Sequence, residues 1–135
     1  MIPFLFSTLK LIVAGVLGGL IGYERETDSK PAGFRTMILV SMGSCLFTIA
    51  SINIAQTGDG LFDPGRIASG IVTGIGFLGA GAILRSSGQV LGLTTAASIW
   101  LVAAVGMAVG MGMYGEALLA TVIGFVVLRK RIFPR

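Results

Sequence analysis

A long uncharged stretch, residues 67–84, limits what this chain can fold into. It contains no Asp, Glu, Lys or Arg, and it lies between Arg66 and Arg85. As an α-helix with a rise of ~1.5 Å per residue it would measure ~27 Å. That length nearly equals the ~30 Å hydrocarbon core of a bilayer, so the stretch predicts a membrane-spanning helix.

The composition extends this prediction to the whole chain. Of the 135 residues 54% are hydrophobic and 12% are charged, whereas soluble domains carry ~25% charged residues. We therefore expect one all-α integral membrane domain over residues 1–135. The sequence has no His and a single Cys, Cys45, which excludes His-dependent catalysis, His metal ligation and an internal disulfide. We expect neither an enzyme nor a cofactor, and no nucleic-acid partner, because the basic residues crowd the C-terminus beside an apolar segment.

Turn-forming and charged residues divide the apolar sequence into about five predicted spans, which we expect to form a helical bundle. The predicted spans cover residues 3–22, 34–56, 67–84, 94–110 and 114–128. The alternative is four spans, with one helix over residues 94–128. Such a helix would be ~52 Å long, well beyond the bilayer core, so five spans are favoured.

The basic residues predict the orientation of this bundle. With five spans and an outside N-terminus, Arg66 lies outside and Lys10 lies within the first span. The inner side then holds Arg25, Lys30, Arg35, Arg85, Arg129, Lys130, Arg131 and Arg135. The positive-inside rule thus favours an outside N-terminus and an inside C-terminus.

Small residues form faces on several of the spans. On the third span, Ile67, Ile71 and Ile75 share one helical arc, and small residues occupy the opposite arc. These are Ser69, Thr73, Gly76 and Ala80, widened by Gly70, Gly74 and Gly81. Small faces let helix backbones approach closely in lipid, so we expect Gly70, Gly74, Gly76 and Gly81 to pack against another helix. Trp100 of the fourth span is also expected in helix packing.

Pairs of glycines four residues apart predict further close contacts on two other spans. They are Gly15 with Gly19 and Gly18 with Gly22 on the first span, and Gly106 with Gly110 on the fourth. Residues 74–79 also match the dinucleotide-binding pattern G-x-G-x-x-G. That pattern requires a preceding strand and a following acidic residue, and this apolar stretch offers neither, so helix packing is the favoured interpretation.

Four blocks in order resemble a known family. Residues 22–26 (Gly-Tyr-Glu-Arg-Glu), 32–36 (Ala-Gly-Phe-Arg-Thr), 74–81 and 92–100 (Gly-Leu-Thr-Thr-Ala-Ala-Ser-Ile-Trp) are similar to the membrane domain of the MgtC/SapB family. The family often has Asn where Thr94 stands. Many members carry a soluble cytoplasmic domain after the membrane part, and the sequence here stops at Arg135, so a function seated in that domain is not expected of it.

The resemblance implies a multi-pass protein of the bacterial inner membrane. Members are linked to growth at low magnesium and to survival of pathogens inside host cells. Some are thought to bind and restrain other membrane complexes. By this resemblance we expect a non-enzymatic regulator or accessory factor that contacts itself, as a homo-oligomer with a dimer favoured, or another inner-membrane complex. The alternative is a magnesium or small-ion transporter or channel subunit, which requires a polar path through the bilayer.

The predicted topology gathers candidate site residues near the inner surface. They are Glu24, Arg25, Arg35, Thr36, Arg85, Thr94 and Thr95. Glu24 ends the first span and Arg35 begins the second, so a hairpin could bring this pair into contact. Such a cluster can fix the helix arrangement or bind a ligand or partner, and the sequence leaves both open.

Charged residues on the outer side offer two further candidates. Lys10 lies within the first span and Glu116 opens the fifth, so the two could form an ion pair, or Lys10 could extend alone to the surface. Asp59 and Asp63 in the loop before the third span are weak candidates for a magnesium site. Asp-Gly and Asp-Pro pairs are also typical of turns, and turn formation is the favoured interpretation.

Overall fold

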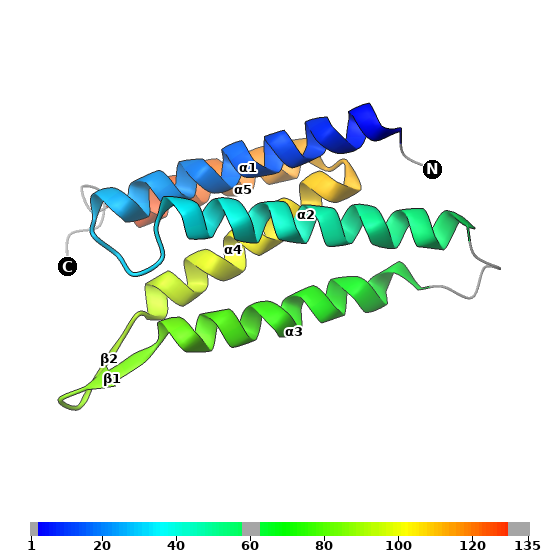
Figure 1. Cartoon of the computed structure of the whole chain (residues 1–135). Helices are drawn as coiled ribbons and strands as arrows, with labels where there is room; N and C mark the ends of the chain where they lie inside the picture. The colour runs from blue at the N-terminus through cyan, green and yellow to red at the C-terminus, as the bar shows by residue number, and fades with distance from the viewer. Residues whose placement is uncertain (1–2, 58–62, 130–135) are drawn as a thin grey trace.

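The computed structural model describes residues 3–57 and 63–129, and it confirms an all-α bundle. Its helices are α1 (Phe4–Thr27), α2 (Phe34–Thr57), α3 (Pro64–Ala82), α4 (Leu93–Met111) and α5 (Tyr114–Leu128). A small antiparallel hairpin of β1 (Leu84–Ser86) and β2 (Gln89–Leu91) joins α3 to α4. Successive helices run in opposite directions, so that α1 begins at one end of the bundle and α5 finishes at the other (Figure 1).

The helix boundaries follow the predicted spans closely, with two differences. The first helix continues past residue 22 to Thr27, and α3 begins at Pro64 and ends at Ala82. Among the described residues, α1, α2 and α4 are long and apolar enough to cross a bilayer, and α5 is a shorter apolar helix. The fold is therefore that of a membrane bundle, while the crossing of the bilayer by all five helices stays a prediction.

Helix α1 packs against α2 through its paired glycines, as predicted. A Cβ atom added to Gly18 would lie 2.7 Å from the carbonyl oxygen of Met37, and one added to Gly22 would lie 2.7 Å from the Cα atom of Phe34. Only residues without side chains allow two backbones to come so close. The small residues of α1 thus determine its distance from α2.

The glycine pair of α4 also contacts α2, next to the contact with α1. A Cβ atom on Gly106 would collide with the carbonyl oxygen of Ser41, and one on Gly110 would lie 2.7 Å from the Cβ atom of Thr48. Helix α2 therefore packs closely against both α1 and α4, and Ser41 takes part in both contacts. The predicted close contact at Gly106 and Gly110 is confirmed, and α4 contacts each of the other four helices.

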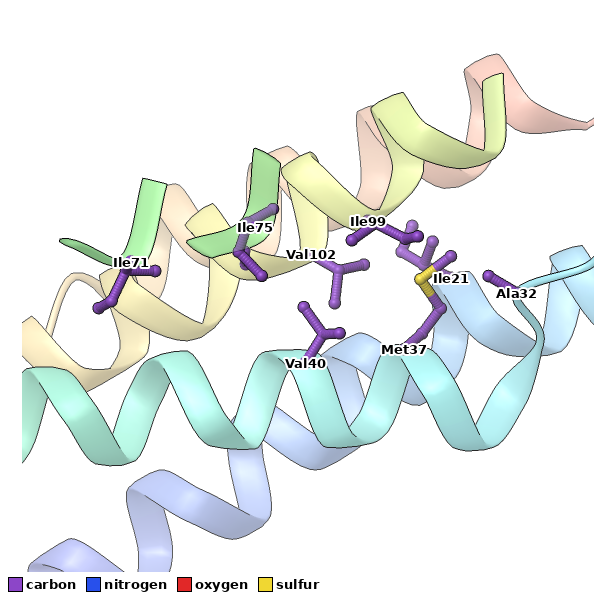
Figure 2. Close-up of a cluster of buried hydrophobic side chains, with 9 residues drawn as sticks. Ile21, Ala32, Met37, Val40, Ile71, Ile75, Ile99 and Val102 are labelled. Atoms are coloured by element: carbon purple, nitrogen blue, oxygen red, sulfur yellow. The ribbon is translucent and has the colours of Figure 1, made fainter. Parts of the chain in front are cut away.

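Helix α3 presents its large side chains, and not its small residues, to the rest of the chain. Its large side chains Ile71 and Ile75 face inward, toward a cluster that includes Val40 of α2 and Val102 of α4 (Figure 2). The predicted packing glycines have open space where a Cβ atom would project. This holds for Gly70, Gly74, Gly76 and Gly81.

These four glycines therefore do not contact another helix of the same chain, and their packing against another protein stays a prediction. Gly79 is the α3 glycine that packs, because its Cβ position lies 3.7 Å from the Cβ atom of Ala96 in α4. Trp100, also expected in packing, is 55% exposed. In lipid neither large nor small apolar faces are driven inward by water, so steric fit decides which face meets the bundle.

The connection between α3 and α4 is a short hairpin. Ser87 and Gly88 both have positive φ, at 50° and 80°, as two-residue type I′ hairpin turns require. Gly92, with φ 88°, follows the hairpin, and a Cβ atom there would collide with the carbonyl oxygen of Ala82. Gly92 is the N-cap of α4, so Thr94 and Thr95 lie inside the helix.

Candidate functional site

One end of the bundle gathers the basic residues, and we call it the basic end. Here α1 and α3 end, α2 and α4 begin, and α5 ends (Figure 1). Arg25, Lys30, Arg35 and Arg129 lie at this end, whereas Arg66 lies at the start of α3, at the other end. The predicted separation of charge holds for these described residues, whereas Lys130, Arg131 and Arg135 lie outside the described part of the chain. The assignment of the basic end to the inside of a cell stays a prediction.

A buried contact between Arg25 and Thr95 forms the centre of the basic end. The Nη2 atom of Arg25 donates a hydrogen bond of 2.9 Å to the Oγ1 atom of Thr95. The two side chains are only 3% and 2% exposed, respectively. Burying a charged group is costly without hydrogen bonds, so this contact stabilises the packing of α1 against α4. The sequence placed both residues in one cluster but did not pair them.

Glu24 and Arg35 lie in different surroundings. Glu24 is buried, at 6% exposure, whereas Arg35 is exposed on the first turn of α2. The contact that the hairpin would allow between them stays a prediction. Thr36 and Thr94 are also exposed. The backbone of Arg85 lies on β1, at the same end of the bundle.

Glu26 makes a further polar contact at this end, one that the sequence did not predict. Its Oε2 atom accepts a hydrogen bond of 2.8 Å from the backbone N–H of Phe34, the first residue of α2. A carboxylate at a helix N-terminus satisfies a free N–H group and complements the helix dipole. A Cβ atom on Gly33 would lie 2.9 Å from the same carboxylate oxygen, so glycine leaves the room that the cap needs.

In the sequence this cap corresponds to the pattern Glu-x₆-Gly-Phe, which crosses the connector from α1 to α2. The pattern does not have the spacing of a standard capping motif, so the sequence did not identify the cap. The cap borders a shallow pocket of about 290 Å³ at the surface. Lys30, Arg35 and Thr36 also line this pocket. Two exposed members of the predicted cluster, Arg35 and Thr36, therefore line a small surface depression, separate from the buried Arg25–Thr95 contact.

Lys10 is satisfied by a backbone carbonyl at the opposite end of the bundle. Its Nζ atom donates a hydrogen bond of 2.7 Å to the carbonyl oxygen of Gly110, in the last turn of α4. The N–H groups of Gly112 and Met113 bond to the carbonyls of Val109 and Ala108, which leaves the Gly110 carbonyl for Lys10. A cation also complements the negative end of the α4 dipole.

The predicted ion pair between Lys10 and Glu116 is therefore wrong for the described residues. Glu116 is exposed in the first turn of α5. Asp63 performs the turn chemistry that the sequence favoured, because its Oδ1 atom accepts a hydrogen bond of 2.8 Å from the N–H of Gly65 and caps α3. Asp59 lies outside the described residues, so the magnesium site remains untested. Over residues 3–57 and 63–129, no three His, Cys, Asp or Glu side chains gather in a way that could hold a metal ion.

These features define the class of protein. It is a helical membrane bundle whose buried polar contacts connect one helix to another. The sequence matches the model of the MgtC family over residues 11–132. The chain belongs to the MgtC family.

Curated relatives share this membrane part. The chain is 44% identical to the "Putative magnesium transporter YhiD" of Escherichia coli K12, over 89% of this chain and 58% of the relative. It is 42% identical to the protein SapB of Bacillus subtilis (93% and 56%), and 44% identical to the protein MgtC of Salmonella typhimurium (91% and 50%). The chain thus spans little more than half the length of these relatives. No solved structure matches it.

Proposed function

We propose that this chain is a non-enzymatic regulator or accessory factor of magnesium homeostasis in the bacterial inner membrane. It acts by helix–helix contact with a second copy of itself or with another membrane complex. Membership of the MgtC family supports the magnesium link, and the name of the Escherichia coli relative refers to magnesium directly. The intracellular survival associated with this family belongs to the same proposal.

The observation that carries the proposal is the outer face of α3, formed by Ser69, Thr73, Gly76 and Ala80. All four residues are exposed, and Gly76 has open space around its Cβ position. A face of small residues allows a second helix to approach to backbone contact, which is how helices associate where lipid removes the hydrophobic drive. The same kind of face already holds α1 and α4 against α2 inside this bundle.

The second candidate is a transporter or channel subunit for magnesium or another small ion. One observation favours it: Ser41, Ser44, Thr48 and Ser51 form a buried row along α2, and hydroxyl groups can line an ion path. The close approach of Gly106 and Gly110 to this row leaves little space inside one subunit. Magnesium flux into proteoliposomes containing the purified chain, above that of empty vesicles, would favour this candidate.

The proposed regulatory role is tested by a substitution that adds a large side chain to the outer face of α3. Gly76→Leu places a side chain on that face, and Gly115→Leu is a matched control because the Cβ position of Gly115 in α5 is also open. We expect Gly76→Leu to abolish co-purification of the partner or second copy and the low-magnesium phenotype, with normal membrane insertion. Gly115→Leu should preserve both. If Gly76→Leu keeps both the co-purification and the low-magnesium phenotype, the proposed mode of action is contradicted.

A further inference from the structure

A groove between α2 and α3 opens on the side of the bundle. Its volume is about 710 Å³, and α2 and α3 both contribute to its lining. The floor includes Ile71 and Ile75, and Phe47 of α2, at 62% exposure, stands at its side. Gly43 and Gly74, one from each helix, have no atoms within 4 Å of a Cβ position. The space between the two helices is therefore unfilled by the chain itself.

One end of this groove carries a positive charge. Arg66, in the first turn of α3, is exposed and lines the groove. Among the described residues no carboxylate forms an ion pair with it, and the Asp63 carboxylate at the same end bonds to the N–H of Gly65. The N-terminus of α3 adds the positive end of a helix dipole. An apolar groove thus leads to a cationic mouth.

The dimensions of the groove match one leaflet of a bilayer. Along α3 its lining extends from Arg66 to Leu78, which is ~18 Å at a rise of ~1.5 Å per residue. Half of a ~30 Å hydrocarbon core is ~15 Å. With Arg66 at the level of the headgroups, the remainder of the groove therefore lies at the depth of the acyl chains.

We propose that the groove between α2 and α3 binds an anionic phospholipid of the surrounding bilayer. The Arg66 guanidinium binds the headgroup phosphate, for which its planar fork of N–H donors is suited. An acyl chain lies over Ile71 and Ile75, in the space left by Gly43 and Gly74. Along the membrane normal, the charged mouth lies at the level of a lipid headgroup and the apolar groove lies at the depth of the acyl chains.

A second copy of this chain is a poorer occupant of the groove. Two copies related by a two-fold axis along the membrane normal have their Arg66 residues at the same depth. If α3 of each copy met the other at this groove, the two guanidinium groups would approach each other, and juxtaposed like charges oppose association. The outer face of α3, proposed above for protein contact, does not include Arg66. The lipid site and the protein contact are thus two separate faces of one helix.

Native mass spectrometry of the full chain, released from micelles containing equal amounts of phosphatidylglycerol and phosphatidylethanolamine, tests the site. We expect one retained phosphatidylglycerol per chain. Arg66→Gln should reduce its retention about tenfold, the loss expected for a charge-assisted hydrogen bond, and should remove the preference over phosphatidylethanolamine. Gly74→Leu fills the groove and should abolish retention of both lipids.

Gly76→Leu is the matched control, because position 76 has the same open surroundings on the face of α3 away from the groove. It should retain phosphatidylglycerol like the wild-type chain. Equal retention of the two lipids by wild type, or unchanged retention in Gly74→Leu, overturns the proposal. A dimer that Gly74→Leu dissociates while lipid retention stays constant would assign the groove to a second copy and also overturn it.

Discussion

The tight packing of α4 on α2 yields the sharpest stability prediction. In Gly106→Ala the new Cβ atom collides with the carbonyl oxygen of Ser41, and Ser41 also contacts Gly18 of α1, so it has little room to move. Inserting a methyl group into a packed interior costs about 1–3 kcal/mol. Because the obstacle is a backbone atom and not a flexible side chain, we expect the free energy of unfolding to fall by ~3 kcal/mol. At 1.4 kcal/mol per factor of ten, that is roughly a 100-fold change in the folding equilibrium.

The measurement is reversible unfolding in mixed micelles with increasing SDS, followed by circular dichroism. Gly76→Ala is the control, because its Cβ atom enters open space, and replacing a helical glycine by alanine gains up to about 1 kcal/mol. The two variants should therefore shift the midpoint in opposite directions. A Gly106→Ala variant within ~0.5 kcal/mol of wild type would refute the close packing of α4 on α2.

Two further predictions concern the buried polar contacts. Lys10→Met removes the donor to the Gly110 carbonyl and should cost about 1.5–3 kcal/mol in the same unfolding assay, whereas Glu116→Gln should cost less than about 1 kcal/mol, since only a helix-dipole contact is lost. Thr95→Val removes the acceptor for Arg25 and should also cost about 1.5–3 kcal/mol, and Thr95→Ser, which keeps the hydroxyl, should recover most of this loss.

Each of these pairs has a result that would contradict it. If Glu116→Gln destabilised the bundle as much as Lys10→Met, the two charges would be coupled and the carbonyl contact would not explain the stability. If Thr95→Ser behaved like Thr95→Val, shape and not the hydroxyl would account for the effect.

The sequence was sufficient for the helices and for the close-approach faces of α1 and α4, but not for α2 as the helix that both faces contact. Apolar runs interrupted by charged or glycine-rich connectors determine where helices begin and end, and glycines four residues apart on α1 and α4 mark faces that can approach a neighbour. The orientation of α3 could not be predicted. Its face containing Ile71 and its face containing Gly76 are both compatible with lipid, so hydrophobicity does not decide which one meets the bundle.

The candidate site was predicted in its location but not in its contacts. Positive charges marked the basic end, yet the acceptor for Arg25 depended on Gly92 beginning α4 and so directing Thr95 inward. The partners of Lys10 and Glu26 are backbone groups. Every residue offers such groups, so no residue type in the sequence identifies them.

Site-specific photocrosslinking from position 76 in living bacterial membranes tests the proposed mode of action most directly. With a photoreactive phenylalanine in place of Gly76, illumination should join the chain to one discrete protein, either a second copy or a larger membrane component. Crosslinks to lipid alone from position 76, in a chain that still supports growth at low magnesium, would contradict action through protein contact at α3.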